Sequence, residues 1–245
     1  MRPIRAVFYD LDGTLRLNVP NSWRVFAEFA RELGLVSTPA DLQRVARWEH
    51  AYFAQSPEIL ADSAAFPEPA DFWRNFCQRE LLALGADSRQ AVELAPLLSR
   101  RMDEDYKPAD LLPEGLLETL AALKADGYLL GVLSNRDKPY TDYLAKRGLM
   151  EFFDLALYAG EAGFYKPHPA VFEYLLEKAG VSAAEAVYVG DNYYADVVGA
   201  RQAGLQPVLF DLHDLFPEAD CPVIQAHSQI YSLLERREAW PGKEN

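Results

Sequence analysis

The chain has 245 residues, of which half are hydrophobic, so it is long enough for one large domain or for a core domain with an inserted module. Its 37 acidic and 24 basic residues give a net charge of −13, which disfavours nucleic acid and anionic membranes as partners. Its two cysteines, Cys77 and Cys221, form no metal-binding pair, and no apolar stretch is long enough to span a membrane, so we expect a cytoplasmic protein.

The first predicted strand, residues 6–9, ends in two alternating carboxylates, Asp10 and Asp12, and a glycine turn at Gly13 follows at once. Residues two apart in a strand point to the same face, so we expect the two carboxylates to lie close together unless the turn re-aims the second. Two like charges that close require a cation, a proton or a hydrogen-bond network. Taken alone, the segment is better explained by a strand that simply ends in an acidic turn, and only the motifs that follow it change this interpretation.

No strand is predicted between residues 15 and 111, and helical patterns fill this interval. Thr38 followed by Pro39 is typical of a helix N-cap and first turn. The four amphipathic patterns cover residues 22–33, 39–53, 70–84 and 88–104. We therefore expect residues 16–108 to form a helical module that is inserted into a core made of residues 1–15 and 109–245.

Short apolar strands alternate with helical patterns in the rest of the chain. After the first strand, the predicted strands cover residues 128–133, 155–158, 186–189 and 207–210, with a weak sixth at 222–224. The helical patterns between them cover residues 114–126, 140–147, 170–179 and 195–203. Gly148, Gly180 and Gly204 end the last three of these patterns, as helix stops do. This alternation predicts an α/β fold, a doubly wound parallel sheet with helices on both faces.

Polar residues follow four of the predicted strands. Asp10 and Asp12 follow the first strand, and Ser134 and Asn135 follow the second. Lys166, which precedes a proline, comes after the third strand, and Asp191 and Asp196 come after the glycine that ends the fourth. Each of these segments alone is ordinary, as a helix cap, a turn or a solvated loop charge. In an open parallel sheet, however, ligands bind outside the carboxyl ends of the strands. The joint pattern therefore predicts carboxylates, a hydroxyl group and a lysine at one edge of one sheet.

The motifs D-x-D-G-T, S-N, K-P and G-D-x-x-x-x-D, in this order, resemble those of the haloacid dehalogenase superfamily. The whole chain resembles the phosphatase-type members, whose helical cap is inserted between the first and second motifs. The resemblance implies a Rossmann-like catalytic core with an inserted α-helical bundle as its cap domain. It also implies a Mg²⁺-dependent phosphatase that hydrolyses a small-molecule phosphomonoester through an aspartyl-phosphate intermediate.

The same resemblance implies a role for each residue that handles the phosphoryl group. Asp10 would be the nucleophile, and Asp12 would protonate the leaving oxygen and then activate water. Ser134 and Lys166 would hold the phosphoryl oxygens, and Asn135 would orient the phosphate-binding site. The chemistry agrees, because a carboxylate attacks a phosphate dianion only when nearby groups offset the negative charge.

The expected cofactor is Mg²⁺. The resemblance implies that the carboxylates of Asp10 and Asp191 and the backbone carbonyl of Asp12 bind the metal. Asp196 would support the metal-bound waters and Lys166. Mg²⁺ prefers carboxylates, waters and phosphate oxygens, which agrees with this set of ligands.

Two alternatives to the phosphatase remain open. Asp12 favours phosphoryl over carbon–halogen chemistry, because the dehalogenases that this fold resembles lack the second aspartate of the first motif. A phosphomutase on the same scaffold is the nearest alternative. A non-catalytic regulator that binds a phosphorylated ligand or a protein is the second, although the intact catalytic set argues against it. The expected partner is a small phosphorylated metabolite, and both a monomer and a homodimer remain open.

Overall fold

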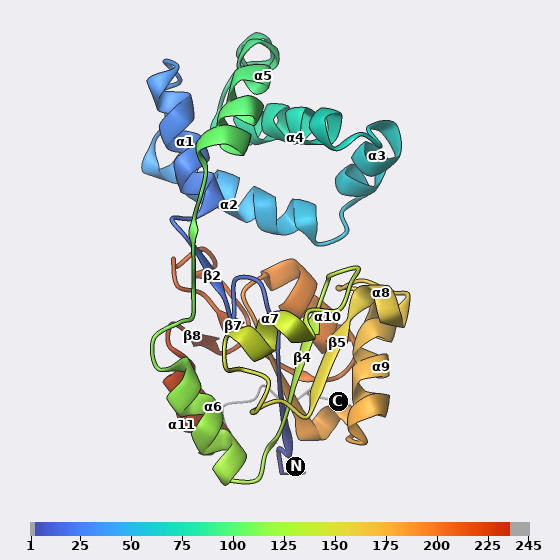
Figure 1. Ribbon diagram of the computed structural model, residues 1–245. Helices are drawn as coiled ribbons and strands as arrows, with labels where there is room; N and C mark the ends of the chain where they lie inside the picture. Colours follow the sequence, from blue (N-terminus) through green and yellow to red (C-terminus); the bar gives the residue numbers. More distant parts are fainter. Residues whose placement is uncertain (1–2, 236–245) are drawn as a thin grey trace. The chain divides into compact units, whose positions relative to one another are not determined.

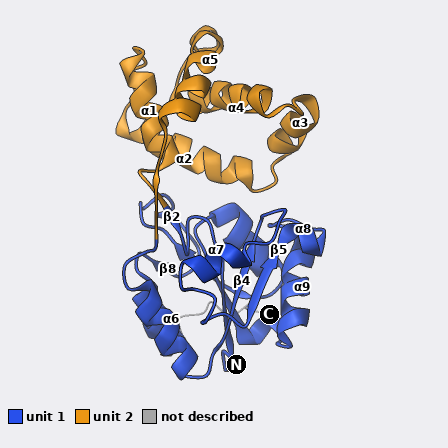
Figure 2. Ribbon diagram, viewed as in Figure 1, with its two compact units in different colours: residues 1–17, 112–245 blue, residues 18–111 orange. Residues whose placement is uncertain are grey.

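The computed structural model describes residues 3–235 of the chain. Two compact units make up the protein (Figure 2): unit 1 contains residues 1–17 and 112–245, and unit 2 contains residues 18–111. Within the described residues, no helix combines the length and the apolar character that crossing a membrane requires.

Unit 1 is built on a six-stranded sheet in the order β5-β4-β1-β6-β7-β8 (Figure 1). Every neighbouring pair of strands is parallel, so the predicted parallel sheet is confirmed, including its weak sixth strand. The strands are β1 (Ala6–Tyr9), β4 (Leu129–Ser134), β5 (Leu155–Tyr158), β6 (Ala186–Gly190), β7 (Gln206–Phe210) and β8 (Val223–Ile224). The central strand β1 lies between β4 and β6, so the chain reverses its direction of winding beside β1. That position is where open α/β sheets bind ligands.

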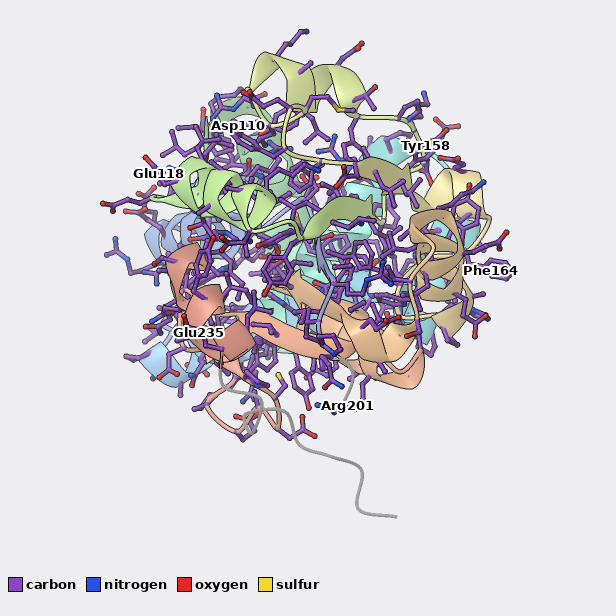
Figure 3. The ribbon with its side chains drawn as sticks, turned by 90° about the horizontal axis from the view of Figure 1, so that it is seen from below. Asp110, Glu118, Tyr158, Phe164, Arg201 and Glu235 are labelled. Carbon is purple, nitrogen blue, oxygen red and sulfur yellow. The ribbon has the colours of Figure 1, made fainter. Side chains whose placement is uncertain are left out.

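The two faces of the sheet are both covered, because the side chains of β1 alternate between two apolar clusters. Val7 and Tyr9 pack in one cluster, with side chains of α6 (Leu116–Ala125), α7 (Thr141–Lys146) and α11 (Ile230–Glu235). Ala6 and Phe8 pack in the other, with α9 (Pro169–Ala179) and α10 (Gly199–Gln202). Polar side chains such as Glu118 on α6 and Arg201 on α10 point outward from the unit (Figure 3). The doubly wound arrangement follows from this two-sided burial.

The helices of unit 1 differ from the predicted ones in one place that concerns the site. The pattern at residues 195–203 predicts one helix, but the structure has a π-helical segment at Tyr193–Val198 that continues into α10. The side chain of Asn192 caps this segment and accepts hydrogen bonds from the amides of Tyr194 and Ala195. The remaining short helices are α8 (Ala159–Ala162) and the 3₁₀ turns Ala183–Glu185 and His227–Gln229.

Unit 2 is helical, as expected, but it contains five helices where four were predicted. They are α1 (Ser22–Glu32), α2 (Pro39–Phe53), α3 (Pro57–Ala65), α4 (Pro69–Leu84) and α5 (Ser88–Asp105). The N-cap of α2 at Thr38 is confirmed, since Thr38 and Asp41 form a reciprocal capping box. The unpredicted α3 has a similar start, with Ser56 as cap and Pro57 in its first turn.

The interval predicted to hold no strand also contains a short two-stranded sheet. Strands β2 (Leu17–Val19) and β3 (Ala109–Leu111) pair with each other where the chain passes into and out of unit 2. Each has only three residues, which is too short for sequence periodicity to reveal.

Candidate active site

Asp10 follows β1 directly, and its position is fixed from two sides. Its backbone amide donates a hydrogen bond to the carbonyl of Val189 at 2.8 Å, which continues the pairing of β1 with β6. Its carboxylate is buried and accepts a hydrogen bond from Nζ of Lys166 at 2.5 Å. The carboxylate therefore lies at the carboxyl end of the central strand and has a defined cationic partner.

Lys166 lies in the loop before α9 and is only 2% exposed. Its ammonium group donates to Oδ1 of Asp10, to Oδ1 of Asp196 at 2.6 Å and to the hydroxyl of Tyr188 at 3.0 Å. The Tyr188 hydroxyl in turn donates to the carbonyl of Leu133 in β4. A buried ammonium needs this complete set of partners, because burial without them strongly disfavours its charge.

The S-N motif ends β4 beside the lysine. The amide of Lys166 donates to Oδ1 of Asn135 at 2.7 Å, and Nδ2 of Asn135 donates to the carbonyl of Lys166 at 2.9 Å. Asn135 thus holds the backbone of Lys166 through both of its amide atoms. Ser134, the last residue of β4, is buried at the same edge of the sheet.

Asp191 and Asp196 come from the end of β6 and the π-helical segment. Thr14 donates its hydroxyl to Oδ1 of Asp191 at 3.1 Å. The second oxygen of Asp196 accepts the amide of Asn192 at 2.9 Å, so both oxygens of Asp196 already have donors. The carboxylate of Asp196 is therefore held by the backbone at the start of the π-helical segment.

Two glycines allow these carboxylates to approach the backbone. A Cβ atom at Gly190 would collide with the carboxylate of Asp196, and one at Gly13 would collide with that of Asp191. Gly13 also has a φ of 93°, which side-chain-bearing residues rarely adopt. Glycine is thus required at both positions by the closeness of the carboxylates.

Asp12 points to a different environment from Asp10. Its side chain is nearly half exposed and accepts two hydrogen bonds from the guanidinium of Arg136, at 2.9 and 2.8 Å. Arg16 adds a third contact at 3.0 Å. The turn at Gly13 therefore directs the second carboxylate toward two arginines, although its charge still contributes to raising the pKa of Asp10.

The carboxylates suit a divalent cation. Oxygen atoms of Asp10, Asp191 and Asp196 all lie within 4.8 Å of one another. Burial raises the pKa of Asp10 to about 7 against the opposing effect of Lys166, and burial also raises the pKa of Asp191 well above its usual value. One ammonium among three carboxylates leaves negative charge uncompensated, and hard oxygen donors are what Mg²⁺ prefers. The donor set therefore fits a divalent metal, and Asp196 is already bonded through both of its oxygens.

His227 is a residue of the site that the sequence did not indicate. It is fully buried, its Nε2 lies 3.0 Å from the carbonyl of Thr14, and its ring stacks on Phe210 at a centroid distance of 4.5 Å. Since the carbonyl can only accept, His227 donates from Nε2 and holds the turn whose hydroxyl binds Asp191. Burial lowers the pKa of His227 to about 4, so the ring is neutral at physiological pH.

Four other residues that were not predicted share one property: each contacts a predicted site residue. They are Thr14, Arg16, Arg136 and Tyr188. Arg136 directly follows the S-N motif and Thr14 belongs to the first motif, so their positions in the sequence could have indicated them. Tyr188 and His227 had no comparable signal, because an aromatic residue in a strand and a lone histidine are ordinary core residues.

Comparison with known proteins gives one consistent result. A family model described as haloacid dehalogenase-like hydrolase matches residues 4–204. The human haloacid dehalogenase-like hydrolase domain-containing protein 3 is 30% identical over 91% of this chain and 86% of its own length. The glyceraldehyde 3-phosphate phosphatase of Pyrococcus furiosus is 30% identical, over 96% of this chain and 95% of its own. A 2-haloacid dehalogenase structure from Pseudomonas syringae pv. Tomato DC3000 shares 28% identity and a TM-score of 0.52, and the match covers 95% of this chain and 99% of that one.

The buried neutral His227 should make the stability of the protein pH-dependent. Its pKa is about 4 in the folded protein and about 6.5 in the unfolded chain, so the unfolded state binds a proton that the folded state does not. The free energy of unfolding should therefore fall as the pH drops below about 6.5, by up to about 1.4 kcal/mol per pH unit.

The variant His227→Gln retains a hydrogen-bond donor toward Thr14 but does not titrate in this pH range. The decrease in its unfolding free energy with falling pH should therefore be smaller than that of the wild type. Urea unfolding from neutral to mildly acidic pH measures both proteins, with exposed His213→Gln as the control, which should follow the wild type. A difference in unfolding free energy between His227→Gln and the wild type that stays constant with pH would contradict the assignment.

Proposed function

The chain belongs to the haloacid dehalogenase-like hydrolases, and from this premise we propose that it is a Mg²⁺-dependent phosphatase acting on a small phosphomonoester through an aspartyl-phosphate. The observation that carries the proposal is the buried contact of Lys166 with Asp10, beside Asp191, at the carboxyl end of the central strand. The phosphatase named among its relatives supports phosphoryl chemistry.

Asp10 is the proposed nucleophile. Lys166 fixes its carboxylate, which attacks the phosphorus and forms an acyl-phosphate bond while the bond to the leaving oxygen breaks. Asp12 donates a proton to that leaving oxygen. Asp12 then accepts a proton from a water molecule, which attacks the phosphorus and releases inorganic phosphate from Asp10.

The metal would be held by the carboxylates of Asp10 and Asp191 and by the backbone carbonyl of Asp12. When bound, Mg²⁺ supplies positive charge that offsets the charge of the phosphoryl oxygens. Ser134 and the ammonium of Lys166 bind the same oxygens from the protein side. Asn135 acts through the backbone of Lys166, which it holds by two hydrogen bonds, and Asp196 keeps the ammonium in place.

Arg136 and Arg16 are proposed to assist Asp12. Their guanidinium groups contact and orient the Asp12 carboxylate, the form that exists after the proton has gone to the leaving group. That form is also the one that accepts a proton from water in the second step. While Asp12 holds its proton, the bidentate contact with Arg136 must weaken, because a protonated carboxyl group carries no negative charge and one of its oxygens is a hydroxyl.

Asp12 favours this proposal over dehalogenation, because protonation of a leaving alkoxide needs an acid and release of a halide does not. A phosphomutase would use the same residues but would return the phosphoryl group to a hydroxyl of the substrate. A non-catalytic binding protein has no need for both aspartates. Product analysis separates the three, since only the phosphatase releases inorganic phosphate in proportion to substrate consumed.

Turnover of an aryl phosphate should require Mg²⁺ and the Asp10 carboxylate. Asp10→Asn should remain folded and lose several orders of magnitude in kcat, because the amide is not a nucleophile. Phosphate release is the measurement, with added chelator and with Asp142→Asn, an exposed aspartate of α7, as the matched control. Full activity in excess chelator would refute the metal, and near wild-type activity of Asp10→Asn would refute the nucleophile.

Lys166→Met removes the ammonium but keeps a side chain of similar length. It should weaken the binding of vanadate, a phosphate analogue, and lower kcat/KM, because no other ammonium offsets the phosphoryl charge among the described site residues. Loss of a buried ion-pair partner also costs about 3–5 kcal/mol of stability, so folding is checked by circular dichroism. Unchanged vanadate affinity in the folded variant would place Lys166 outside the phosphate site.

We further propose that the expected cap domain, residues 16–108, selects the substrate, and that its part within unit 2, from residue 18 onward, does not take part in phosphoryl transfer. Every residue assigned to phosphoryl transfer belongs to unit 1. Replacing residues 22–104 with a short Gly/Ser linker should therefore retain slow cleavage of an aryl phosphate and abolish discrimination among metabolite phosphates. A folded linker variant with the selectivity of the wild type would contradict this division of roles.

A further inference from the structure

Unit 2 contains a pocket of its own. Its volume is about 720 Å³, within the range of roughly 300–1,000 Å³ that small-molecule sites occupy. Side chains of α2, α4 and α5 line it, and most of its surface is apolar. Three rings form an aromatic wall, defined as Phe53, Trp73 and Phe76, with centroids 5.3 Å apart for Phe53–Phe76 and 5.5 Å for Trp73–Phe76.

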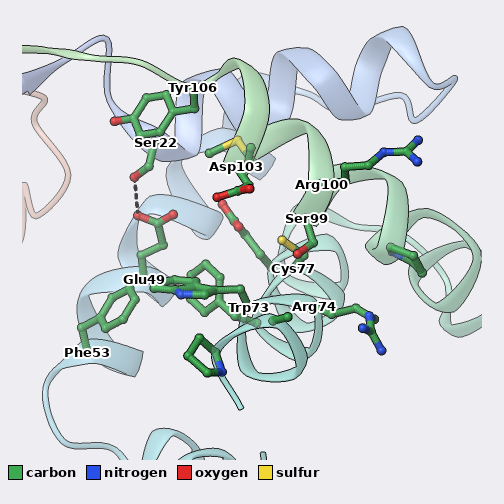
Figure 4. A pocket seen from close by; sticks show the side chains of 16 residues that line it. Ser22, Glu49, Phe53, Trp73, Arg74, Cys77, Ser99, Arg100, Asp103 and Tyr106 are labelled. Carbon is green, nitrogen blue, oxygen red and sulfur yellow. Dashed lines mark hydrogen bonds between the residues drawn. The ribbon is translucent and has the colours of Figure 1, made fainter.

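Two buried carboxyl groups interrupt this apolar lining. Glu49 of α2 is 9% exposed and Glu80 of α4 is 2% exposed, and the two share a hydrogen bond. Ser22 donates to Oε2 of Glu49 at 3.4 Å, which Figure 4 shows as a dashed line. Oε1 of Glu80 is buried and has no hydrogen-bond partner among the described residues. An unpaired buried oxygen is costly, so this atom points to a donor that the chain itself does not provide.

The charged groups that line the pocket indicate the charge of the hydrogen-bond donor that it can bind. Burial raises the pKa of Glu49 to about 7 and that of Glu80 well above its usual value, so the pair retains a proton while nothing else neutralises it. Asp103 adds a third carboxylate at the end of the pocket that Ser22 and Tyr106 also line (Figure 4). A cation is therefore favoured over an anion. Two arginines, Arg74 and Arg100, also line the pocket. Arg74 is already paired with Asp71 at 3.0 Å, and the side chain of Arg100 points away from Glu49 and Asp103 (Figure 4).

The lining of the pocket suits an organic cation better than a metal ion. A metal site needs several ligand atoms close together. Among the described residues, three such atoms lie within 4.8 Å of one another at Asp10, Asp191 and Asp196, but no such group occurs in this pocket. The aromatic wall places three rings at the pocket surface, and contacts between aromatic rings and cations stabilise ammonium groups in particular. The remaining apolar surface suits a hydrocarbon or aromatic body.

We propose that this pocket binds a small organic amine, whose ammonium group is held by Glu80 and Glu49 and whose apolar body lies against the aromatic wall. The ammonium satisfies the unpaired oxygen of Glu80 and replaces the shared proton of the carboxyl pair. The site lies wholly within unit 2 and does not depend on the phosphatase assignment.

Calorimetric titration of the full-length protein tests the proposal with three probes of one shape: 2-phenylethylamine, uncharged 2-phenylethanol and anionic 3-phenylpropionate. The amine should bind at least about 10-fold more tightly than the alcohol, and the acid should not bind. Glu80→Gln should abolish the preference for the amine, whereas Glu93→Gln, at an exposed residue of α5, should leave it unchanged. Trp73→Leu, at a residue 49% exposed, should weaken binding of the amine by about 10-fold and serves if Glu80→Gln does not fold.

Three results would overturn the proposal. One is equal affinity for the amine and the alcohol, and another is the absence of saturable amine binding at millimolar concentrations. The third is amine binding that neither Glu80→Gln nor Trp73→Leu changes, which would place the amine elsewhere, for example on the acidic residues of unit 1. Because no measurement here requires turnover, failure of the phosphatase assignment would leave these outcomes interpretable.

Discussion

The buried ammonium of Lys166 is the interaction on which the rest of the site depends. It contacts Asp10 and Asp196 in a region where water does not screen charge, and it opposes the effect of burial, which raises the pKa of Asp10. The lysine reaches this position because Asn135 fixes its backbone and Tyr188 supplies a third acceptor. One residue therefore connects the ends of β1, β4 and β6 with the loop before α9.

The topology of the sheet explains why these groups meet. In the order β5-β4-β1-β6, the strand that carries Asp10 lies between the strand that ends in Ser134 and the strand that precedes Asp191. Residues more than a hundred positions apart thus become neighbours through the pairing of parallel strands. The close approach then demands glycine at Gly13 and Gly190, since a Cβ atom at either would occupy the space of a carboxylate. The strand pairing and the carboxylates of the site together require glycine at these two positions.

The sequence predicted the sheet well, because buried parallel strands are short apolar runs and their ends carry the polar residues. It predicted less about where side chains point. The alternation of Asp10 and Asp12 suggested one shared face, but the turn after β1 directs Asp12 to Arg136 and Arg16. Helix α3 was missed because its nine residues lack an apolar stripe, and His227 because its contact with Thr14 spans almost the whole chain. Such contacts arise from tertiary packing, which periodicity does not encode.

Both units contain buried carboxyl groups, but their charge is compensated differently in each unit. In unit 1 a lysine offsets the charge, and the remaining negative charge suits a divalent cation. In unit 2 no lysine is present beside Glu49 and Glu80 among the residues that line the pocket, so the pair is held by a shared proton, and one oxygen stays unsatisfied. An apolar pair of similar volume would pack there at lower cost. Retaining two acids at that cost is understandable if a cationic ligand supplies the missing charge, and this argument distinguishes a binding pocket from a packing defect in the helical unit.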